Sequence, residues 1–282
     1  MLVITGGCGF IGSAMIRFLN QTNRNDLIIV DNHNVYPRNL KNLNYRKFYD
    51  IDDTSIFEQK IDGVLHFGAI SDTLEKNEQC IQKYNIDSTA RWSNWCRENG
   101  IPMIFASTAA IYGNGNGPLN LYAESKIKCE EIIKDSAMCF RLFNVYGFGE
   151  AHKGRMASVI YKWQNELKTN HFIKLFEESH LYKRDFIHVS DVCKAFINAL
   201  NDFIPGVYDL GSGTQKSFED VADIILTNKI GTKKYIAMPE DLKKQYQINT
   251  LADMSVSCRW LQSPIQLREG VIQYLGDLQN EE

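Results

Sequence analysis

The sequence predicts an α/β fold in which a Rossmann-type, doubly wound parallel sheet carries a smaller α/β lobe. Three features favour this fold. Short apolar runs alternate with longer helical patterns in the first half of the chain, a glycine-rich turn joins the first run to the first helix, and an acidic residue ends the second run. Strands that alternate with helices are typical of a parallel sheet covered by helices on both faces.

The expected strands are rich in Val, Ile, Leu and Phe and are bounded by turn residues. They occupy residues 2–5, 27–31, 47–51, 63–67, 103–107 and 138–142. The helical patterns between them include residues 12–21, 85–99 and 122–134. Sheets of this kind bind ligands outside the carboxyl ends of their strands, so we expect the functional residues to lie there.

The size and charge of the chain restrict the class of protein. At 282 residues it exceeds the length at which one hydrophobic core usually keeps growing, which predicts two lobes. A net charge of −3 offers no basic surface for nucleic acid or acidic lipid. No apolar run approaches the ~18 residues that span a bilayer, and the chain opens on an apolar strand pattern without a basic leader. We therefore expect a cytoplasmic protein with no nucleic-acid or membrane partner.

The cysteines and histidines do not suggest a metal or a disulfide framework. The seven cysteines are scattered and contain no CxxC pair, and the six histidines form no HxxxH or HExxH pattern. Structural zinc sites and disulfide scaffolds need regular close spacing of these residues. We expect no metal.

The turn after the first strand has the pattern of a dinucleotide-binding loop. Gly6, Gly9 and Gly12 recur at every third position, directly after the apolar run and before the first helix. The first glycine permits the tight turn, the second lets a pyrophosphate approach the backbone, and the third lets helix and strand pack closely. Asp31, at the end of the second strand, is placed to accept a hydrogen bond from the ribose of adenosine.

This loop, and a change near residue 147 to a more polar and less regular sequence pattern, predict that the chain is divided into two domains. Residues 1–147 form the expected dinucleotide-binding domain, and residues 148–282 form the expected substrate-binding lobe. Within the second part, the apolar runs 185–189 and 206–210 look like strands. We expect the segment 185–211 to return to the first domain.

A tyrosine and a lysine four residues apart predict a catalytic pair. Tyr122 and Lys126 fall on one face of the helix expected at residues 122–134. A nearby cation stabilises phenolate and lowers the pKa of tyrosine from about 10 towards neutrality. Such a tyrosine can act as a general acid or base.

With these motifs the chain resembles the extended short-chain dehydrogenase/reductase family over nearly its whole length. Further matches are His66-Phe67-Gly68-Ala69, Ser107-Thr108-Ala109-Ala110-Ile111-Tyr112-Gly113 and Arg141-Leu142-Phe143-Asn144-Val145-Tyr146-Gly147. The resemblance implies that Thr108 hydrogen-bonds the reacting oxygen, Tyr122 moves its proton, and Lys126 binds the nicotinamide ribose and tunes Tyr122. It assigns the dinucleotide contacts to Gly6, Gly9, Phe10, Ile11, Gly12, Asp31, Asn32, Arg38, Asp50, Ile51, Phe67, Gly68, Ala69, Ser71, Asn85, Tyr122, Lys126 and Val145.

Within that family the chain is similar to the ADP-glycero-manno-heptose 6-epimerases, which supply heptose for lipopolysaccharide. The similarity lies in the segment Ala151-His152-Lys153-Gly154 and in the residues 174–179 and 183–186. It implies oxidation of a sugar carbon to a ketone and return of hydride to the opposite face, with Lys153 as a second base opposite Tyr122. The implied substrate contacts are Ser71, Asn144, Lys153, Arg155, Lys162, Phe176, Glu177, Glu178, Ser179, Arg184 and Tyr246. Arg155 and Lys162 stand where those enzymes have serine and histidine.

The cofactor expected from the residues is NADP, with NAD as the alternative. The carboxylate of Asp31 bonds a 2′-hydroxyl and repels a 2′-phosphate, which favours NAD. Arg38, however, stands where the heptose epimerases place a phosphate-binding lysine, and arginine grips a phosphate through several donors. We also expect a nucleotide-diphosphate sugar as the substrate, and a homo-oligomer.

Three other functions were compared with this one. A nucleotide-sugar 4,6-dehydratase needs acidic residues directly after Thr108, and Ala109 and Ala110 stand there instead. A hexose nucleotide-sugar 4-epimerase or reductase shares most of the motifs and remains the alternative. A non-catalytic dinucleotide-sensing module is disfavoured, because such modules typically lose the tyrosine–lysine pair that this chain keeps.

Overall fold

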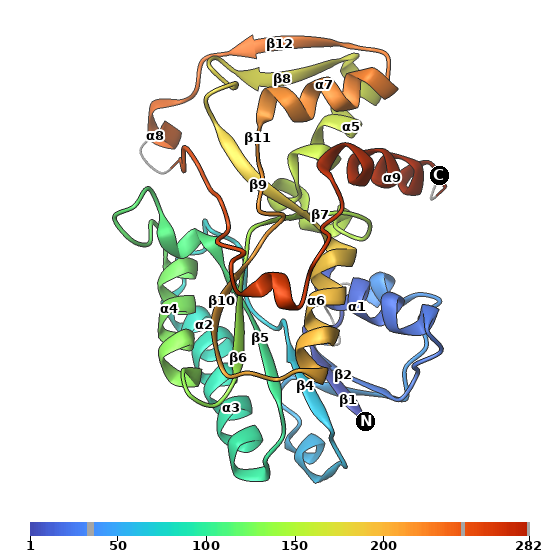
Figure 1. Ribbon diagram of the computed structural model, residues 1–282, viewed down its shortest axis with the longest axis vertical. Helices are drawn as coiled ribbons and strands as arrows, with labels where there is room; N and C mark the ends of the chain where they lie inside the picture. The colour runs from blue at the N-terminus through green and yellow to red at the C-terminus, as the bar shows by residue number, and fades with distance from the viewer. Residues whose placement is uncertain (33–36, 244–245, 281–282) are drawn as a thin grey trace.

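The computed structural model describes residues 1–32, 37–243 and 246–280. A large sheet fills the lower lobe, and two small sheets with their helices form the upper lobe (Figure 1). Among the described residues, the large sheet has seven parallel strands in the order β10-β6-β5-β4-β1-β2-β3. These strands are β1 (Leu2–Thr5), β2 (Leu27–Asp31), β3 (Lys47–Asp50), β4 (Gly63–His66), β5 (Met103–Thr108), β6 (Met138–Leu142) and β10 (Gly206–Leu210).

Helices cover both faces of this sheet, as expected for a doubly wound fold. One face carries α1 (Phe10–Gln21) and α6 (Val189–Asn201), which pack against each other; the other carries α2 (Glu78–Ile81), α3 (Ser88–Asn99) and α4 (Leu121–Ile133). A π-helical turn (Gln82–Asp87) joins α2 to α3. The predicted α/β fold with a Rossmann-type parallel sheet is confirmed.

The pleat of the strands divides the core between the two faces. Leu2 and Ile4 of β1 belong to the core beneath α1 and α6, whereas Val3 belongs to the core beneath α3 and α4. Successive side chains of a strand point to opposite faces, so a strand buried on both sides is apolar throughout. Burial of each large apolar side chain contributes roughly 1.5–3 kcal/mol, which fixes the register of these strands.

The upper lobe surrounds a separate core. Within the described residues, β7 (Asn144–Tyr146), β9 (Lys183–His188) and β11 (Gln215–Ser217) form a three-stranded sheet, and β8 (Phe172–Phe176) pairs with β12 (Thr232–Ile236). The helices here are α5 (Val159–Asn170), α7 (Phe218–Asn228), α8 (Glu240–Lys243) and α9 (Leu267–Asn280). The core between them contains Trp163, Phe186, Ile225 and Tyr274.

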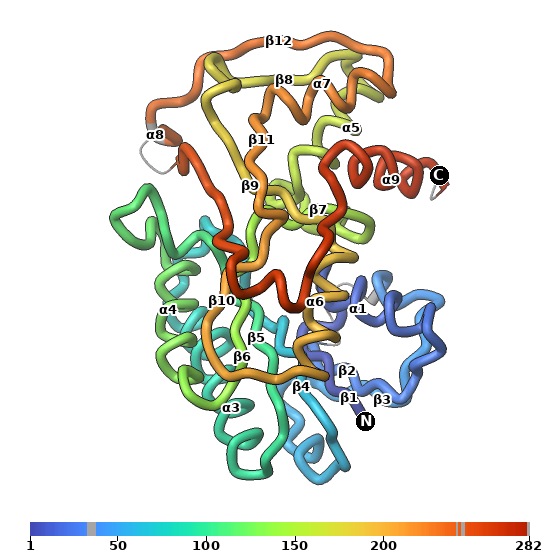
Figure 2. Tube along the Cα trace, viewed as in Figure 1, coloured from blue at the N-terminus to red at the C-terminus, as the bar shows by residue number. Residues whose placement is uncertain are grey.

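The chain crosses between the lobes several times (Figure 2). Of the two strands expected to return to the first domain, β10 pairs with β6 in the large sheet, whereas β9 pairs with β7 and β11 in the upper lobe. A later segment also returns, because Trp260 and Leu261 pack in the core beneath α1 and α6. Among the residues described, no helix combines the length and apolar character that a membrane span requires.

Candidate active site

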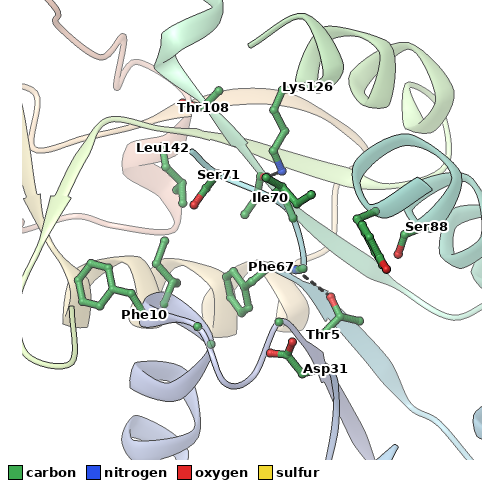
Figure 3. Close-up of a pocket in the computed structure, with 18 of the residues that line it drawn as sticks. Thr5, Phe10, Asp31, Phe67, Ile70, Ser71, Ser88, Thr108, Lys126 and Leu142 are labelled. Carbon is green, nitrogen blue, oxygen red and sulfur yellow. Dashed lines mark hydrogen bonds between the residues drawn. The ribbon is translucent and has the colours of Figure 1, made fainter. Parts of the chain in front are cut away.

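A cavity of about 560 Å³ lies where the strands of the large sheet end. Its wall includes Thr5 at the end of β1, Asp31 at the end of β2, Thr108 at the end of β5 and Leu142 at the end of β6. Lys126 and Thr108 lie on one side of the cavity, and Phe10 and Asp31 lie on the other, beside the glycine turn (Figure 3). This is the edge of a parallel sheet at which ligands bind.

The glycine turn is shaped so that side chains would obstruct it. Gly6 has φ +67°, and a Cβ there would lie 2.7 Å from the backbone nitrogen of Gly68. A Cβ on Gly12 would come within 2.2 Å of the carbonyl oxygen of Gly6. Helix α1 begins directly after this turn, and the first turn of a helix has backbone N–H groups without helical partners. The cradle therefore fits the diphosphate of a dinucleotide.

Asp31 lies in the cavity wall beside this cradle. Its carboxylate accepts hydrogen bonds from the backbone nitrogens of Cys8 at 2.8 Å and Asn32 at 2.7 Å, and burial raises its pKa. Asn32 and Ile51 also line the cavity, but Arg38 and Asp50 do not, and Arg38 is exposed. The structure thus brings the carboxylate to the cavity without the arginine.

The loop after β4 lines the cavity, and the side chain of Asn85 fixes it from the side away from the cavity. Phe67, Gly68, Ala69 and Ser71 all line the cavity. Asn85 does not line it; its amide bonds both backbone groups of Ile70, at 2.7 and 3.1 Å, and donates to Ser125 of α4 at 3.0 Å. Asn85, expected to contact the dinucleotide, instead fixes the loop that does so against the helix that carries Tyr122.

The predicted catalytic residues on β5 and α4 come together at the cavity. Thr108, Tyr122 and Lys126 all line it. The side chain of Asn120 caps α4 by accepting from the backbone nitrogen of Ala123 at 2.9 Å, which fixes where the helix starts. The Nζ atom of Lys126 lies 5.9 Å from the centroid of the Tyr122 ring.

The ionisation of Tyr122 differs from the sequence expectation. Burial raises its pKa to about 12, and a hydrogen bond with Thr108 opposes part of that rise. Burial also lowers the pKa of Lys126, whose Nζ atom donates to the carbonyl oxygen of Ala106 at 2.7 Å. The expected lowering of the tyrosine pKa by Lys126 is absent from this geometry, because burial of the phenol disfavours its charged form.

Lys153 enters the same cavity from the upper lobe. It lies in the 3-10 segment η5 (Ala151–Met156), and its Nζ atom stands 5.4 Å from the centroid of the Phe10 ring. Burial lowers the pKa of Lys153; the negative charge of Glu150 opposes this shift and Lys162 adds to it. A lysine with a lowered pKa has more of the neutral amine that can accept a proton.

The other expected substrate residues of the upper lobe lie outside the cavity wall. Arg184 is buried, with its guanidinium 5.3 and 5.1 Å from the ring centroids of Phe218 and Tyr246. It donates to the carbonyl oxygens of Lys183, Gln247 and Ile248. Burial lowers its pKa.

The segment that follows β8 is similarly engaged in local contacts. The ring of Phe176 packs at 90° against Tyr246, and the buried hydroxyl of Ser179 donates to Glu219 at 2.5 Å. Glu177 and Glu178 are exposed. Phe176 and Arg184 both contact Tyr246, and none of the residues 176–179 lies on the wall of the described cavity.

The three remaining expected contacts lie near η5 and β7. Arg155 forms an ion pair of 2.6 Å with Asp72, and Lys162 donates to the carbonyl oxygen of Arg155 at 3.5 Å. Neither cation lines the cavity, and neither does Asn144, whereas Val145 beside it does. Arg155 therefore joins η5 to the loop after β4 instead of facing the cavity.

Sequence reasoning missed several residues of this site. His152 lines the cavity beside Lys153, and its position within a recognised motif was the available signal. Tyr84, Ser88 and Trp92 line it as well, although they come from a helical pattern that gave no sign of it. Glu130 is buried, and its carboxylate accepts a hydrogen bond of 2.5 Å from the hydroxyl of Ser107, the residue directly before Thr108 in the chain.

Comparison with known proteins agrees with this geometry. A model of the NAD dependent epimerase/dehydratase family matches residues 2–211, so the chain belongs to that family. The predicted resemblance to the extended short-chain dehydrogenase/reductases, and the prediction of an enzyme of the epimerase type, are confirmed at this level. The neighbouring solved structures share the fold.

Three solved structures illustrate the likeness. The ADP-L-glycero-D-manno-heptose-6-epimerase of Helicobacter pylori has a TM-score of 0.88 and 24% identity, over 99% of this chain and 96% of that chain. An NAD dependent NDP-hexosamine 5,6-dehydratase involved in tunicamycin biosynthesis has a TM-score of 0.84 and 22% identity, over 100% and 98%. A UDP-N-acetylglucosamine 4-epimerase from Methanobrevibacter ruminantium M1 has a TM-score of 0.84 and 24% identity, over 98% of each chain.

Proposed function

We propose that this enzyme inverts one carbon of a nucleotide-diphosphate sugar by transient oxidation to a ketone and reduction on the opposite face. The observation that carries the proposal is the meeting of two candidate proton-transfer groups in one cavity. Tyr122 and Thr108 enter it from the large sheet and α4, and Lys153 enters it from η5 in the upper lobe. Inversion of a centre needs proton transfer on two sides, and these residues provide it.

The dinucleotide that best fits the cavity is NAD rather than NADP. Asp31 lies at the cavity wall beside the glycine cradle, and its negative charge repels a 2′-phosphate. Arg38, on which the preference for NADP depended, lies outside that wall. Neighbouring structures of the same fold also hold NAD, among them a UDP-glucuronic acid 4-epimerase from Bacillus cereus.

Each residue of the cavity has a role that its position supports. The hydroxyls of Thr108 and Tyr122 hold the oxygen of the reacting alcohol, and Tyr122, which its raised pKa keeps protonated, donates its proton to that oxygen as the hydride returns. Lys126 keeps a positive charge beneath this pair and orients the dinucleotide ribose. Lys153, whose pKa is lowered, accepts the proton of the alcohol as the hydride leaves, and proton exchange with solvent resets Lys153 and Tyr122 after each turnover. A bound nicotinamide supplies the hydride acceptor and then the hydride donor.

For the substrate we propose an ADP-heptose first and a UDP-hexose second. The Ala151–Gly154 segment, which carries Lys153, supports inversion at the side-chain carbon C6 of a heptose. Arg155 and Lys162 depart from the heptose epimerases, and this departure favours 4-epimerisation of a hexose as the second candidate. In both cases Arg184, once released from its carbonyl partners, is the residue suited to grip a diphosphate.

The experiment is a turnover assay of each sugar nucleotide, with NMR identification of the epimers. Tyr122→Phe should lower kcat by more than a thousandfold while NAD stays bound, because only the proton-transfer oxygen is lost. Tyr45→Phe, an exposed tyrosine away from the cavity, is the matched control. A Tyr122→Phe variant within about tenfold of the parent, only ~1.4 kcal/mol of barrier, would refute the assignment.

Lys153→Ala tests the second side of the scheme. The variant should lose interconversion of epimers while still exchanging hydride slowly on one face of the sugar. If it interconverts epimers at the parent rate, Lys153 has no role as a base. Calorimetry with NAD and NADP then tests the cofactor: NADP binding more tightly than NAD, or Asp31→Ala leaving their affinity ratio unchanged, would contradict the proposal.

A further inference from the structure

A hydrogen-bonded link joins the segment that carries Lys153 to the glycine turn. Asn39 lies in a single 3-10 turn, η1 (Pro37–Leu40), which follows β2. Its amide nitrogen is 2.7 Å from the carbonyl oxygen of Cys8 and 2.9 Å from the Nδ1 atom of His152. One side chain therefore contacts both the dinucleotide-binding turn and η5, which is 113 residues away from it in the chain.

The direction of these bonds follows from the chemistry of the groups. A carbonyl oxygen only accepts, so the amide nitrogen of Asn39 must face Cys8. That nitrogen has two hydrogens, and the second points at His152. The Nδ1 atom of His152 must then accept, which makes the imidazole neutral with its proton on Nε2. Burial lowers the pKa of His152; a hydrogen bond with the backbone of Gly149 opposes this shift and the positive charge of Lys153 adds to it, and the net lowering agrees with a neutral ring.

The link continues to the ribose side of the cavity. The backbone nitrogen of Cys8 donates to Asp31, so both polar groups of the Cys8 residue are engaged, one by Asp31 and the other by Asn39. A ligand that fixes the glycine turn and Asp31 consequently also fixes Asn39. The bond between Asn39 and His152 then fixes the position of His152, and with it that of the adjacent Lys153.

The other attachments of η5 include a bond of His152 to the backbone of Gly149 and the approach of Lys153 to the Phe10 ring at 5.4 Å; Asn39 is the residue that bonds η5 to the carbonyl of the glycine turn. Glu150 lies just before η5 and accepts from the backbone nitrogen and hydroxyl of Ser158, at 2.5 and 2.6 Å, which joins the start of η5 to α5 of its own lobe. The ion pair of Arg155 with Asp72 reaches the lower lobe, but the two side chains are 64% and 33% exposed. Exposed pairs contribute about 0–1 kcal/mol and hold a segment weakly.

We propose that Asn39 is a positioning residue that sets the place of Lys153 by holding His152 against the glycine turn. The inference rests on the proposed function in one respect, the role of Lys153 as a base. A base displaced by about 1 Å can lose on the order of a hundredfold in rate. Asn39 thus couples occupancy of the dinucleotide turn to the assembly of the second proton-transfer group.

The first test is a double-mutant cycle with Asn39→Ala and His152→Ala, measured as kcat and KM for the sugar nucleotide. Each single variant should lower kcat by between about tenfold and a hundredfold, with KM changed by less than about threefold. The double variant should be no slower than the slower single variant, because the two residues act through one contact. Losses that multiply in the double variant would overturn the proposal.

Two further variants separate the donor role from simple packing. Asn39→Asp keeps the shape of the side chain and can still accept from Nδ1 of His152, but its carboxylate cannot donate to the carbonyl oxygen of Cys8, so the bond to the glycine turn is lost and kcat should fall. A parent-like Asn39→Asp would overturn the proposal. Asn44→Ala is the matched control, because this asparagine is exposed and only its backbone atoms form the recorded bonds with Asn20.

Hydrogen exchange provides a readout that does not depend on turnover. In the parent, addition of NAD should slow amide exchange in the peptide that covers residues 150–157. In Asn39→Ala and Asn39→Asp that protection should be lost, while protection of the glycine turn remains. Protection of residues 150–157 that persists in both variants would overturn the proposal. If Lys153→Ala stays active, the proposed function fails, but this exchange experiment still decides whether Asn39 carries the coupling.

Discussion

Replacement of Thr5 with valine removes one hydroxyl from a network beneath the cavity. The Oγ1 atom of Thr5 is 2.7 Å from the Nδ1 atom of His66 and accepts from the backbone nitrogen of Gly68 at 3.1 Å. On its other side His66 meets the hydroxyl of Thr89 at 3.1 Å, and that hydroxyl donates to the carbonyl oxygen of Asn85 at 2.6 Å. The proton of Thr89 is thus committed, so His66 donates through Nε2 and accepts at Nδ1 from Thr5.

The expected loss follows from the two groups that Thr5→Val leaves without a partner. Thr5 and His66 are buried, and a buried polar group without a partner costs roughly 1–3 kcal/mol. The buried Nδ1 atom of His66 loses its partner completely, and the half-buried nitrogen of Gly68 can partly bond water instead. We therefore expect the free energy of unfolding to fall by about 2–4 kcal/mol. At roughly 2–4 °C per kcal/mol, Tm should fall by about 5–15 °C.

The assay is urea unfolding of the parent, Thr5→Val and the control Thr5→Ser, with the slope of the transition checked for equality. Thr5→Ser keeps both hydrogen bonds and loses one methyl group, for about 1 kcal/mol. NAD affinity should weaken in Thr5→Val, because Gly68 lines the cavity. A Thr5→Val variant as stable as Thr5→Ser would refute the network as described.

Three other perturbations follow from the same contacts. Burial lowers the pKa of His66 to about 3, so the contribution of this residue to the free energy of unfolding should be fully present above pH 6.5 and should fall as the pH drops towards 3, because the unfolded chain binds the proton first. Urea midpoints of the parent and of a His66→Gln variant, measured against pH, test this, and the same pH dependence in both would contradict it. Glu130→Gln should lower the free energy of unfolding by an amount at the lower end of about 3–5 kcal/mol, because Arg141 keeps its positive charge and loses the buried carboxylate, 8% exposed in the parent, that pairs with it. Thermal unfolding measures this, and an unchanged Tm would refute it. Asp72→Asn should change Tm by less than about 3 °C, since its pair with Arg155 is exposed, and a larger fall would show that this pair holds η5.

The sequence was most informative where a residue acts through its local backbone. Gly6 directly follows an apolar strand and Gly12 lies in the first turn of the helix after it, and their spacing predicts the cradle that the structure contains. The strands β1, β2 and β6 match the expected residues at both ends, because turn residues bound each apolar run. The four-residue spacing of Tyr122 and Lys126 likewise placed both at one cavity.

The residues that the sequence misplaced act through contacts with distant parts of the chain. Asn85, expected to contact the dinucleotide, bonds Ile70 and Ser125 in the structure, and a contact of its side chain with the cofactor stays a prediction. The pairing of Asn39 with His152 spans 113 residues, and although His152 lies in a recognised motif, no local pattern marks its contact with Asn39. The raised pKa of Tyr122 depends on how deeply the ring is buried, a quantity that spacing along a helix does not contain.

The position of β10 at one edge of the large sheet has a consequence for folding during synthesis on the ribosome. Its neighbour β6 is finished at residue 142, yet the strand that covers it begins at residue 206. During synthesis, β6 therefore remains an unpaired edge, and the apolar surface that α6 later covers remains exposed, while the ribosome makes the part of the upper lobe from β7 to β9. Open edges and uncovered apolar faces recruit other chains. In the interval between these two strands the nascent chain therefore exposes an unpaired strand edge that β10 later covers.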